Sequence, residues 1–257
     1  MQLGATQYLL GVIAAYIIGF SKTGMPGTGI LMVPLMAAIF GGRLSVGATL
    51  PLLVVADCFA VAFYRAHAQW RHLQMLAPWV MAGLLAGTAL LDYLGGHIAR
   101  KDYLGMIIGG LVLFMLGISL LRGKIGEKLV PTSTFGRGLT GIVAGFSTMV
   151  SNAAGPVMAI YMTSTGMLKE QLMGTNAWYF FIFNIVKMPF LAWVTMRHPN
   201  QPMFNHDTLM FDVVMLPMIL VGAFSGKWLL PHIPQKPFNN TVIVLAAVAA
   251  LTLFIPK

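Results

Sequence analysis

Residues 19–29 read GFSKTGMPGTG and interrupt an apolar segment that begins near residue 7. The same opening returns 126 positions later in residues 145–156, which read GFSTMVSNAAGP. Each break combines small, hydroxyl and proline residues, a composition that stops a helix and leaves backbone groups without helical partners. Corresponding breaks in the two halves of a membrane protein are the sequence pattern that best indicates a binding site for a transported substrate.

The composition is that of a membrane protein. Hydrophobic residues make up 58% of the chain and charged residues 9%, whereas a soluble domain has roughly 25% charged residues. Apolar stretches near or above the ~18 residues that span a bilayer recur along the chain. We therefore predict an all-α polytopic membrane protein with about 8–10 transmembrane or half-spanning helices in two repeats. Clear examples of such stretches are residues 73–94, 103–121, 208–230 and 241–255.

Several function classes find no support in the residues. The net charge of +9 fits cationic loops that set membrane orientation and meet anionic lipid, so we expect no nucleic acid partner. Cys58 is the only cysteine, and the histidines and carboxylates show no metal-ligand spacing, so we expect neither metal nor cofactor. No Walker motif is present and no acid, base and nucleophile are clustered, so we do not expect an enzyme.

The duplication extends over the whole chain and keeps its order. We divide the chain into a first repeat at 1–121, a basic cytoplasmic loop at 122–137 and a second repeat at 138–257. The matched pairs are Gly29 with Gly155 and Thr49 with Thr175 at the offset of 126, then Gly87 with Gly222, His97 with His232 and Lys101 with Lys236 at an offset of 135.

Each repeat contains four apolar elements. They are A (7–40; 138–165), B (44–63; 171–193), C (73–94; 208–230) and D (103–121; 241–255). The first element A is too long for one span of about 20 residues and too short for two. Two short helices that meet at a polar tip inside the membrane fit it best, provided that the tip faces protein or a cavity.

The path of element A sets the relation between the repeats. If A returns to the side it entered, the repeats are inverted; if A is one broken span, they are parallel. Lys and Arg counts are equal under the two topologies, and both place loops 64–72 and 122–137 on the richer, cytoplasmic face. The distribution of positive charge therefore does not distinguish inverted from parallel repeats. We favour inverted repeats with broken or re-entrant first helices on the length of element A alone.

The motifs, taken together, resemble the TauE/SafE sulfite-exporter family. They are the paired Gly-Phe-Ser breaks, Gly-Ala-Thr at 47–49 with Gly-Thr-Asn at 174–176, and the His-Ile turns before the last helix of each repeat. The resemblance covers nearly the whole chain. It implies a multi-pass carrier in the bacterial inner membrane for small sulfur-containing or organic anions. The second break lacks the glycine-rich run of the first, which leaves open whether both breaks touch the substrate.

Lys22 is the one formal charge in the first break. A cation in an apolar segment is costly and needs a partner, and here it could bind an anion beside helix N-terminal amides. The alternative is a lysine that extends to the membrane surface. Under the first interpretation, Lys22→Ala abolishes transport without loss of folded protein.

The remaining candidate residues are small, hydroxyl or amide side chains around the two breaks. Positions 176, 180, 184 and 187 fall on one helical face, which suggests a polar seam or, alternatively, hydrogen bonding between helices. Asp57 could pair with a lysine or carry a proton for coupling. The full candidate set for substrate binding is Ser21, Lys22, Thr23, Gly24, Gly27, Thr28, Gly29, Ser147, Thr148, Ser151, Asn152, Asn176, Asn184 and Lys187.

These observations predict a secondary transporter that exports a small sulfur-containing anion by alternating access, with the two tips facing each other. Sulfite, thiosulfate and an organosulfonate such as sulfoacetate are the candidate substrates, and a passive anion channel or an integral-membrane enzyme are the alternatives. The expected partners are the small anion and the lipid bilayer, and a homodimer is compatible with the sequence.

Overall fold

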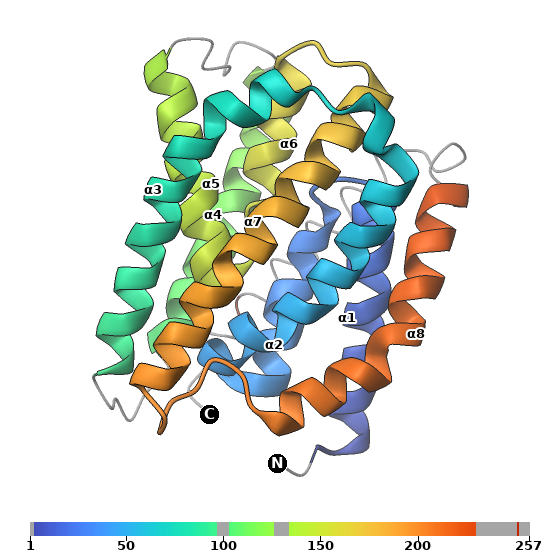
Figure 1. Cartoon of the computed structure of the whole chain (residues 1–257). Coiled ribbons are helices and arrows are strands. Elements are labelled where there is room, and N and C mark those ends of the chain that lie inside the picture. The colour runs from blue at the N-terminus through green and yellow to red at the C-terminus, as the bar shows by residue number, and fades with distance from the viewer. Residues whose placement is uncertain (1–2, 97–102, 126–133, 230–250, 252–257) are drawn as a thin grey trace.

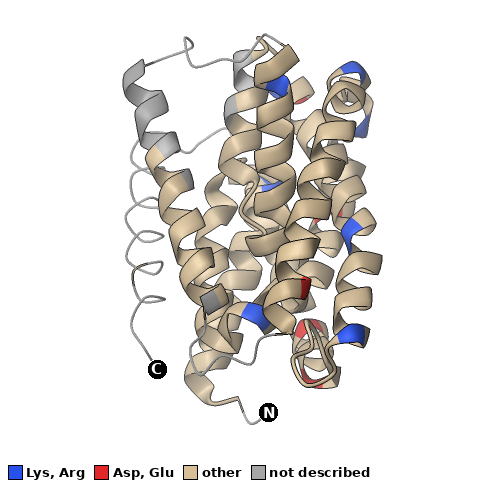
Figure 2. Cartoon of the chain, turned by 90° about the vertical axis from the view of Figure 1, so that its left-hand side faces the viewer, with Lys and Arg blue, Asp and Glu red and all other residues tan. Residues whose placement is uncertain are grey.

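The computed structural model describes residues 3–96, 103–125, 134–229 and 251, and this part of the chain is helical with no strand (Figure 1). Four of its helical segments are long and apolar enough to cross a membrane. Charged residues colour only a few turns of the ribbons (Figure 2). An all-α polytopic membrane protein is therefore confirmed. The helices are α1 (Ala5–Thr23), η1 (Thr28–Leu31), α2 (Met32–Tyr64), η2 (Arg65–His67), α3 (Trp70–Gly95), α4 (Tyr103–Ile125), α5 (Thr134–Ser151), α6 (Gly155–Ser164), α7 (Lys169–Arg197) and α8 (His206–Leu229).

Element A of each repeat is two helices with a break between them, as its length predicted. In the first repeat, α1 ends at Thr23 and the chain continues through η1 into α2. Helix α2 bends at Gly41, whose backbone is non-helical with φ 79° and ψ 169°, so its first part completes A and its second part is B. In the second repeat, A is α5 and α6. Residues 241–255 and the pairs His97 with His232 and Lys101 with Lys236 lie outside the described residues.

Both A elements return to the side from which they came. Tyr8, near the start of α1, and Phe40, at the end of the returning segment, both pack on Phe211, with ring centroids 5.9 and 5.0 Å away. In the second repeat, α5 begins beside α3, where Arg137 donates to Met75 Sδ. Helix α7, which follows α6, begins beside the same end of α3, where Thr175 Oγ1 accepts the Gln69 N–H at 2.8 Å. The tips are thus re-entrant.

The helix directions show that the repeats are inverted. Helices α1 and α8 run parallel, since Gly11 faces Phe211 and Gly19 faces Ile219. Helices α3 and α5 also run parallel, because Gly83 faces Ile142 and Gly87 faces Met149. Helix α1 runs toward the end of α2, where the Tyr64 hydroxyl donates to Thr23 O, and α3 runs back from that end. Counterparts α1 and α5 therefore point in opposite directions (Figure 1), as an axis in the membrane plane requires.

Each repeat packs its element A against element C of the other repeat. A Cβ atom on Gly19 would lie 2.2 Å from Ile219 O, and one on Gly222 would lie 2.2 Å from Tyr16 O. The α3–α5 contact has the same character, with Gly145 against Val80 O at 2.2 Å. Small residues let helix backbones approach this closely, and any side chain there would collide with the main chain. Because element A of each repeat packs on element C of the other, the two tips come together between α2 and α7.

Candidate functional site

The first break reverses the chain through glycine and starts a new helix. The Gly24 N–H still donates to Phe20 O at 2.8 Å, and Gly27 then adopts a left-handed backbone with φ 93°. L-residues other than glycine rarely adopt that conformation. The Thr28 hydroxyl donates to Met25 O at 2.7 Å as η1 begins. The N-terminal end of η1 and α2 consequently lies at the break.

The second break uses asparagine where the first uses glycine. Asn152 follows α5 with φ 57°, the one positive φ on a described residue other than glycine. Asparagine tolerates this left-handed conformation better than most residues. Helix α6 then starts at Gly155, which lies against Gly27: a Cβ on Gly155 would be 3.4 Å from Gly27 Cα. The two tips therefore meet.

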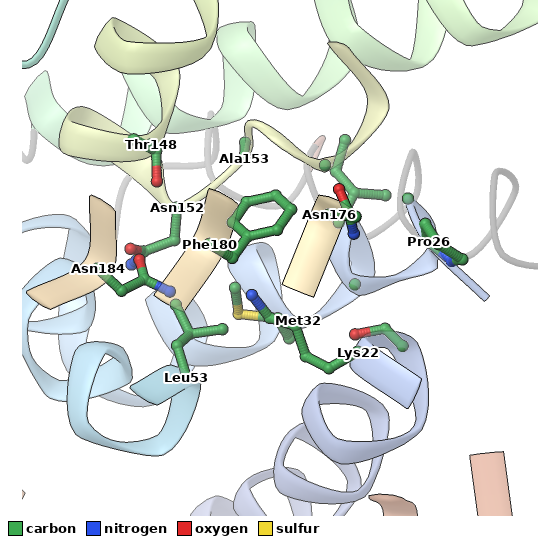
Figure 3. Close-up of a pocket in the computed structure, with 15 residues that line it drawn as sticks. Lys22, Pro26, Met32, Leu53, Thr148, Asn152, Ala153, Asn176, Phe180 and Asn184 are labelled. Atoms are coloured by element: carbon green, nitrogen blue, oxygen red, sulfur yellow. The ribbon is translucent and has the colours of Figure 1, made fainter. Parts of the chain in front are cut away.

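A small cavity of about 40 Å³ lies where the tips meet α2 and α7 (Figure 3). One water molecule needs about 10–15 Å³ of such space, so the cavity has room for about three water-sized groups. Eight of the fourteen candidate substrate residues line it. The lining is Ser21, Lys22, Pro26, Gly27, Gly29, Ile30, Met32, Leu53, Thr148, Asn152, Ala153, Gly155, Asn176, Phe180 and Asn184.

Lys22 is buried and paired at the end of α1. Its ammonium lies 2.7 Å from Asp57 Oδ1 and 3.8 Å from the centroid of the Phe180 ring, and its side chain is only 9% exposed. The ammonium thus meets a carboxylate in the protein interior at the edge of the cavity. Lys22 also lies in the last turn of its helix, where the helix dipole favours a cation, and not beside that helix's N-terminal amides.

Asp57 is the only carboxylate beside this cavity among the residues described, and both its oxygens are engaged. Its Oδ2 accepts the Asn184 side-chain N–H at 2.5 Å, opposite the Lys22 contact. Asp57 is fully buried. In this conformation Asp57 is thus one member of an ion pair with Lys22.

Lys187 holds the second tip from α7. Its ammonium donates to Asn152 Oδ1 at 2.5 Å, to Thr148 O at 3.1 Å and to Thr148 Oγ1 at 3.3 Å. Asn152 in turn donates to Val46 O at 3.1 Å. Lys187 is fully buried, and no carboxylate in the described ranges forms an ion pair with it. Its ammonium therefore contacts two residues of the cavity lining, Thr148 and Asn152.

Two lining groups keep hydrogen-bonding capacity for a ligand. Asn176 is 5% exposed, and its side-chain oxygen has no partner in the part of the chain that the structure describes. The Thr148 hydroxyl accepts from Lys187, which leaves its own hydrogen free to donate. Figure 3 shows the Asn176 amide beside the cavity with Phe180 and Pro26 as neighbours. The expectation that Asn176 and Asn184 face the interior is confirmed.

Six candidate residues lie outside the lining. Thr23 donates to Ala223 O at 2.7 Å and Gly24 packs on Gly226, so both hold α1 against α8. The Thr28 and Ser151 hydroxyls return to carbonyls of their own segments, at 2.7 Å from Met25 O and 2.9 Å from Ser147 O, whereas the Ser147 hydroxyl has no partner in the described residues. Lys187 does not line the cavity itself but donates hydrogen bonds to Thr148 and Asn152, which do. The six are Thr23, Gly24, Thr28, Ser147, Ser151 and Lys187.

Two residues of the lining were not among the candidates drawn from the sequence. Phe180 was recognised only as a position on the polar face of α7, yet its ring covers the Lys22 ammonium. Gly155 was recognised only as a repeat match, yet it opens α6 at the cavity. An aromatic residue among amides at helical spacing is the signal that identifies the first. The second follows from the proline at position 156, which favours the first turn of a helix.

Several groups at the cavity are of the kind that can receive an anion. The N-terminal end of α6 opens at it through Gly155. Helix N-termini carry unpaired N–H groups and a partial positive charge, and they favour anions. The Lys22 ammonium and the free hydrogen of the Thr148 hydroxyl add donors at the same place, and Asp57, the nearby carboxylate, is already neutralised by Lys22.

The model of the family described as sulfite exporter TauE/SafE matches residues 10–253, nearly the whole chain. The chain therefore belongs to this family, as the motifs suggested. The family is one of multi-pass membrane transporters for sulfur anions such as sulfite. No curated protein and no solved structure gives a significant match.

Proposed function

We propose that this TauE/SafE family member is a secondary exporter that binds one small sulfur-containing oxyanion in the cavity between its two breaks. The observation that carries the proposal is the convergence of the α6 N-terminus, the buried Lys22 ammonium and the Thr148 hydroxyl, whose hydrogen is free to donate, on one small cavity. Placement in the bacterial inner membrane, which the family resemblance implies, belongs to the same proposal.

The charges around the cavity favour a monoanion. Lys22 and Asp57 form a neutral pair, while Lys187 adds a positive charge with only neutral acceptors. A buried cation without a counter-ion is costly in the membrane interior, and a bound anion would offset that cost. A single negative charge in the cavity makes these three side chains and the ligand electrically neutral together.

The size of the cavity favours a compact ligand. Room for about three water-sized groups suits a small inorganic oxyanion such as hydrogensulfite, the singly charged form of sulfite, better than an organosulfonate with a carbon chain. The Thr148 hydroxyl, the Asn176 amide and the Lys22 ammonium would donate to its oxygens. Because Phe180 covers Lys22 from one side, the ammonium is directed at Asp57 and at the cavity.

Transport would proceed by movement of one repeat against the other. The tips meet only at glycine surfaces, Gly27 against Gly155, which offer little side-chain interlock. Rocking of inverted repeats around a fixed central site gives alternating access. A membrane potential of 100 mV, negative inside, contributes about 2.3 kcal/mol to the export of one negative charge, so ATP is not required.

Asn176 provides the sharpest test of this site. Asn176→Ala removes an amide that has no protein partner in the described residues, so the melting temperature should stay close to that of the parent protein. A hydrogen bond to a charged group contributes about 1.5–3 kcal/mol, so the KM for sulfite in proteoliposomes should rise by about tenfold to a hundredfold. Asn200→Ala, in an exposed loop, is the matched control.

The same proteoliposomes separate a carrier from a channel. A carrier predicts that internal sulfite accelerates the uptake of labelled external sulfite, whereas a channel gives flux without such acceleration. An unchanged KM in Asn176→Ala would remove the cavity as the binding site. Uptake without counter-flow would replace the carrier with a channel.

A further inference from the structure

Asp212 is a buried carboxylate for which the anion site has no use. It lies on α8, one of the segments able to span a membrane, and it is 4% exposed. It belongs to the face of α8 that packs on the first repeat, together with Phe211 and Met215. Neither of its oxygens has a hydrogen-bond partner in the described part of the chain.

The titratable groups of α1 do not neutralise Asp212. Lys22 is committed to Asp57, at the other end of α1 from the Phe211 contact. The Tyr16 hydroxyl accepts a hydrogen bond from Ser225 at 3.1 Å. Tyr8 stacks on Phe211 and is 41% exposed.

The titratable groups of α2 and of α8 itself are also engaged elsewhere or exposed. Arg43 donates to Gln201 O at 2.6 Å and to Leu91 O at 2.8 Å. Asp57 pairs with Lys22, the Tyr64 hydroxyl donates to Thr23 O, and Cys58 is exposed. On α8, His206, Asp207 and Lys227 are exposed. No described cation forms an ion pair with Asp212.

An ionised carboxylate without a cation or a hydrogen-bond donor is strongly disfavoured in such surroundings, whereas the neutral acid is tolerated. The contrast with Asp57 is direct, because Asp57 has both the Lys22 ammonium and the Asn184 amide to stabilise its charge. Of these two buried aspartates, Asp212 is therefore the neutral acid and Asp57 is the ionised carboxylate.

The helix that carries Asp212 is also attached to the first break. The Thr23 hydroxyl donates to Ala223 O, and Gly24 packs on the main chain at Gly226. Helix α8 runs from His206 to Leu229 with Pro217 between Asp212 and these contacts. The first tip is therefore attached to the same helix that carries Asp212.

We propose that Asp212 is a proton-binding site, protonated in the conformation described, and that it exchanges this proton with water when α8 moves against α1 and α2. The step is a simple ionisation, in which the carboxyl O–H bond breaks, the proton passes to water and a carboxylate remains. The coupling of this step to anion movement rests on the proposed transport function. The presence of the proton on Asp212 does not.

Infrared spectroscopy of the purified full-length protein tests the proton directly. A protonated carboxylic acid has a C=O stretch distinct from that of a carboxylate. We expect this band at neutral pH in the parent protein and in Asp207→Asn, a control on an exposed acid of the same helix. We expect Asp212→Asn, which closely mimics the neutral acid, to lack it. Asp212→Ala replaces that variant if the asparagine form fails to fold.

Transport in proteoliposomes tests the coupling. An imposed pH gradient should change sulfite flux at least tenfold in the parent protein and in Asp207→Asn, but not in Asp212→Asn. A missing acid band, or a band that survives in Asp212→Asn, overturns the proton site. An intact gradient response in Asp212→Asn overturns the coupling alone. If the parent protein moves no sulfur anion, the proposed function fails while the infrared band still decides the proton site.

Discussion

The two breaks share a backbone plan but distribute their charge differently. In the first repeat, the lysine lies on the tip helix and its partner, Asp57, lies on element B. In the second repeat, the lysine lies on element B and its partners, Thr148 and Asn152, lie on the tip. Thr148 occupies the position that corresponds to Lys22 at the offset of 126. Each tip is thus tied to element B of its own repeat by one buried ammonium.

This difference shows what the duplication preserved and what it left free to change. The re-entrant path recurs in both repeats because the helix ends and small residues recur. The electrostatics do not recur, since only the first tie includes a carboxylate. The lysine without a carboxylate partner therefore belongs to the second repeat, although the first repeat supplies the lysine that lines the cavity.

The largest expected loss of stability follows from breaking the Lys22–Asp57 ion pair, which holds the first tip to element B. Lys22→Ala leaves Asp57 buried without its cation, and breaking a buried pair in this way costs about 3–5 kcal/mol of stability. This revises the expectation from sequence that the variant keeps its fold. Lys22→Met combined with Asp57→Leu should recover most of the melting temperature measured in detergent, but not the transport. A single Lys22→Ala variant as stable as the parent would show that Asp57 does not depend on Lys22.

A smaller loss of stability is expected at the second tie. Lys187→Met removes a charged donor from neutral acceptors and strands no carboxylate. Because the variant also removes the desolvation penalty of a buried ammonium, we expect a net loss close to that of one charged hydrogen bond, about 1.5–3 kcal/mol. We expect a lower melting temperature than that of the parent, a milder loss than in Lys22→Ala, and a near-complete loss of sulfite flux because the excess charge is gone. Lys227→Met, at an exposed cation on α8, is the control. Normal flux in Lys187→Met would contradict the assignment of the excess charge.

The smallest expected effect concerns the turn that only the first break builds on glycine. Gly27 has φ 93°, and an added Cβ would make ordinary contacts with Ala159 Cβ at 3.6 Å and Gly155 O at 4.0 Å, so Gly27→Ala is penalised by backbone strain and not by collision. We expect a loss of about 1–2 kcal/mol in the free energy of unfolding. Gly110→Ala, in α4 with no atom within 4 Å of the added Cβ, should be neutral or stabilising. Equal stability of the two variants would mean that the first tip relaxes freely.

Much of the site could be predicted because polar residues in a membrane segment are rare and need partners. Eight of the proposed substrate residues do line the cavity, and the face of α7 that carries Asn176, Phe180 and Asn184 was visible from helical spacing. Asp212 was not among the candidates, although it is an acid inside an apolar span, and the sequence offers no way to tell that it lacks a partner while Asp57 has one.

The sequence by itself determined that this protein is helical, spans a membrane, is duplicated, and has a first element that is broken inside the bilayer, because length, hydropathy and local breaks control those properties. The tertiary structure alone decided the inversion, since equal loop charges fit both topologies and only the contacts of α1 with α8 and of α3 with α5 fix the directions. It also decided which acceptor each lysine meets. Ion pairs join residues far apart along the chain, such as Lys22 with Asp57, and their choice depends on how helices of both repeats are placed side by side.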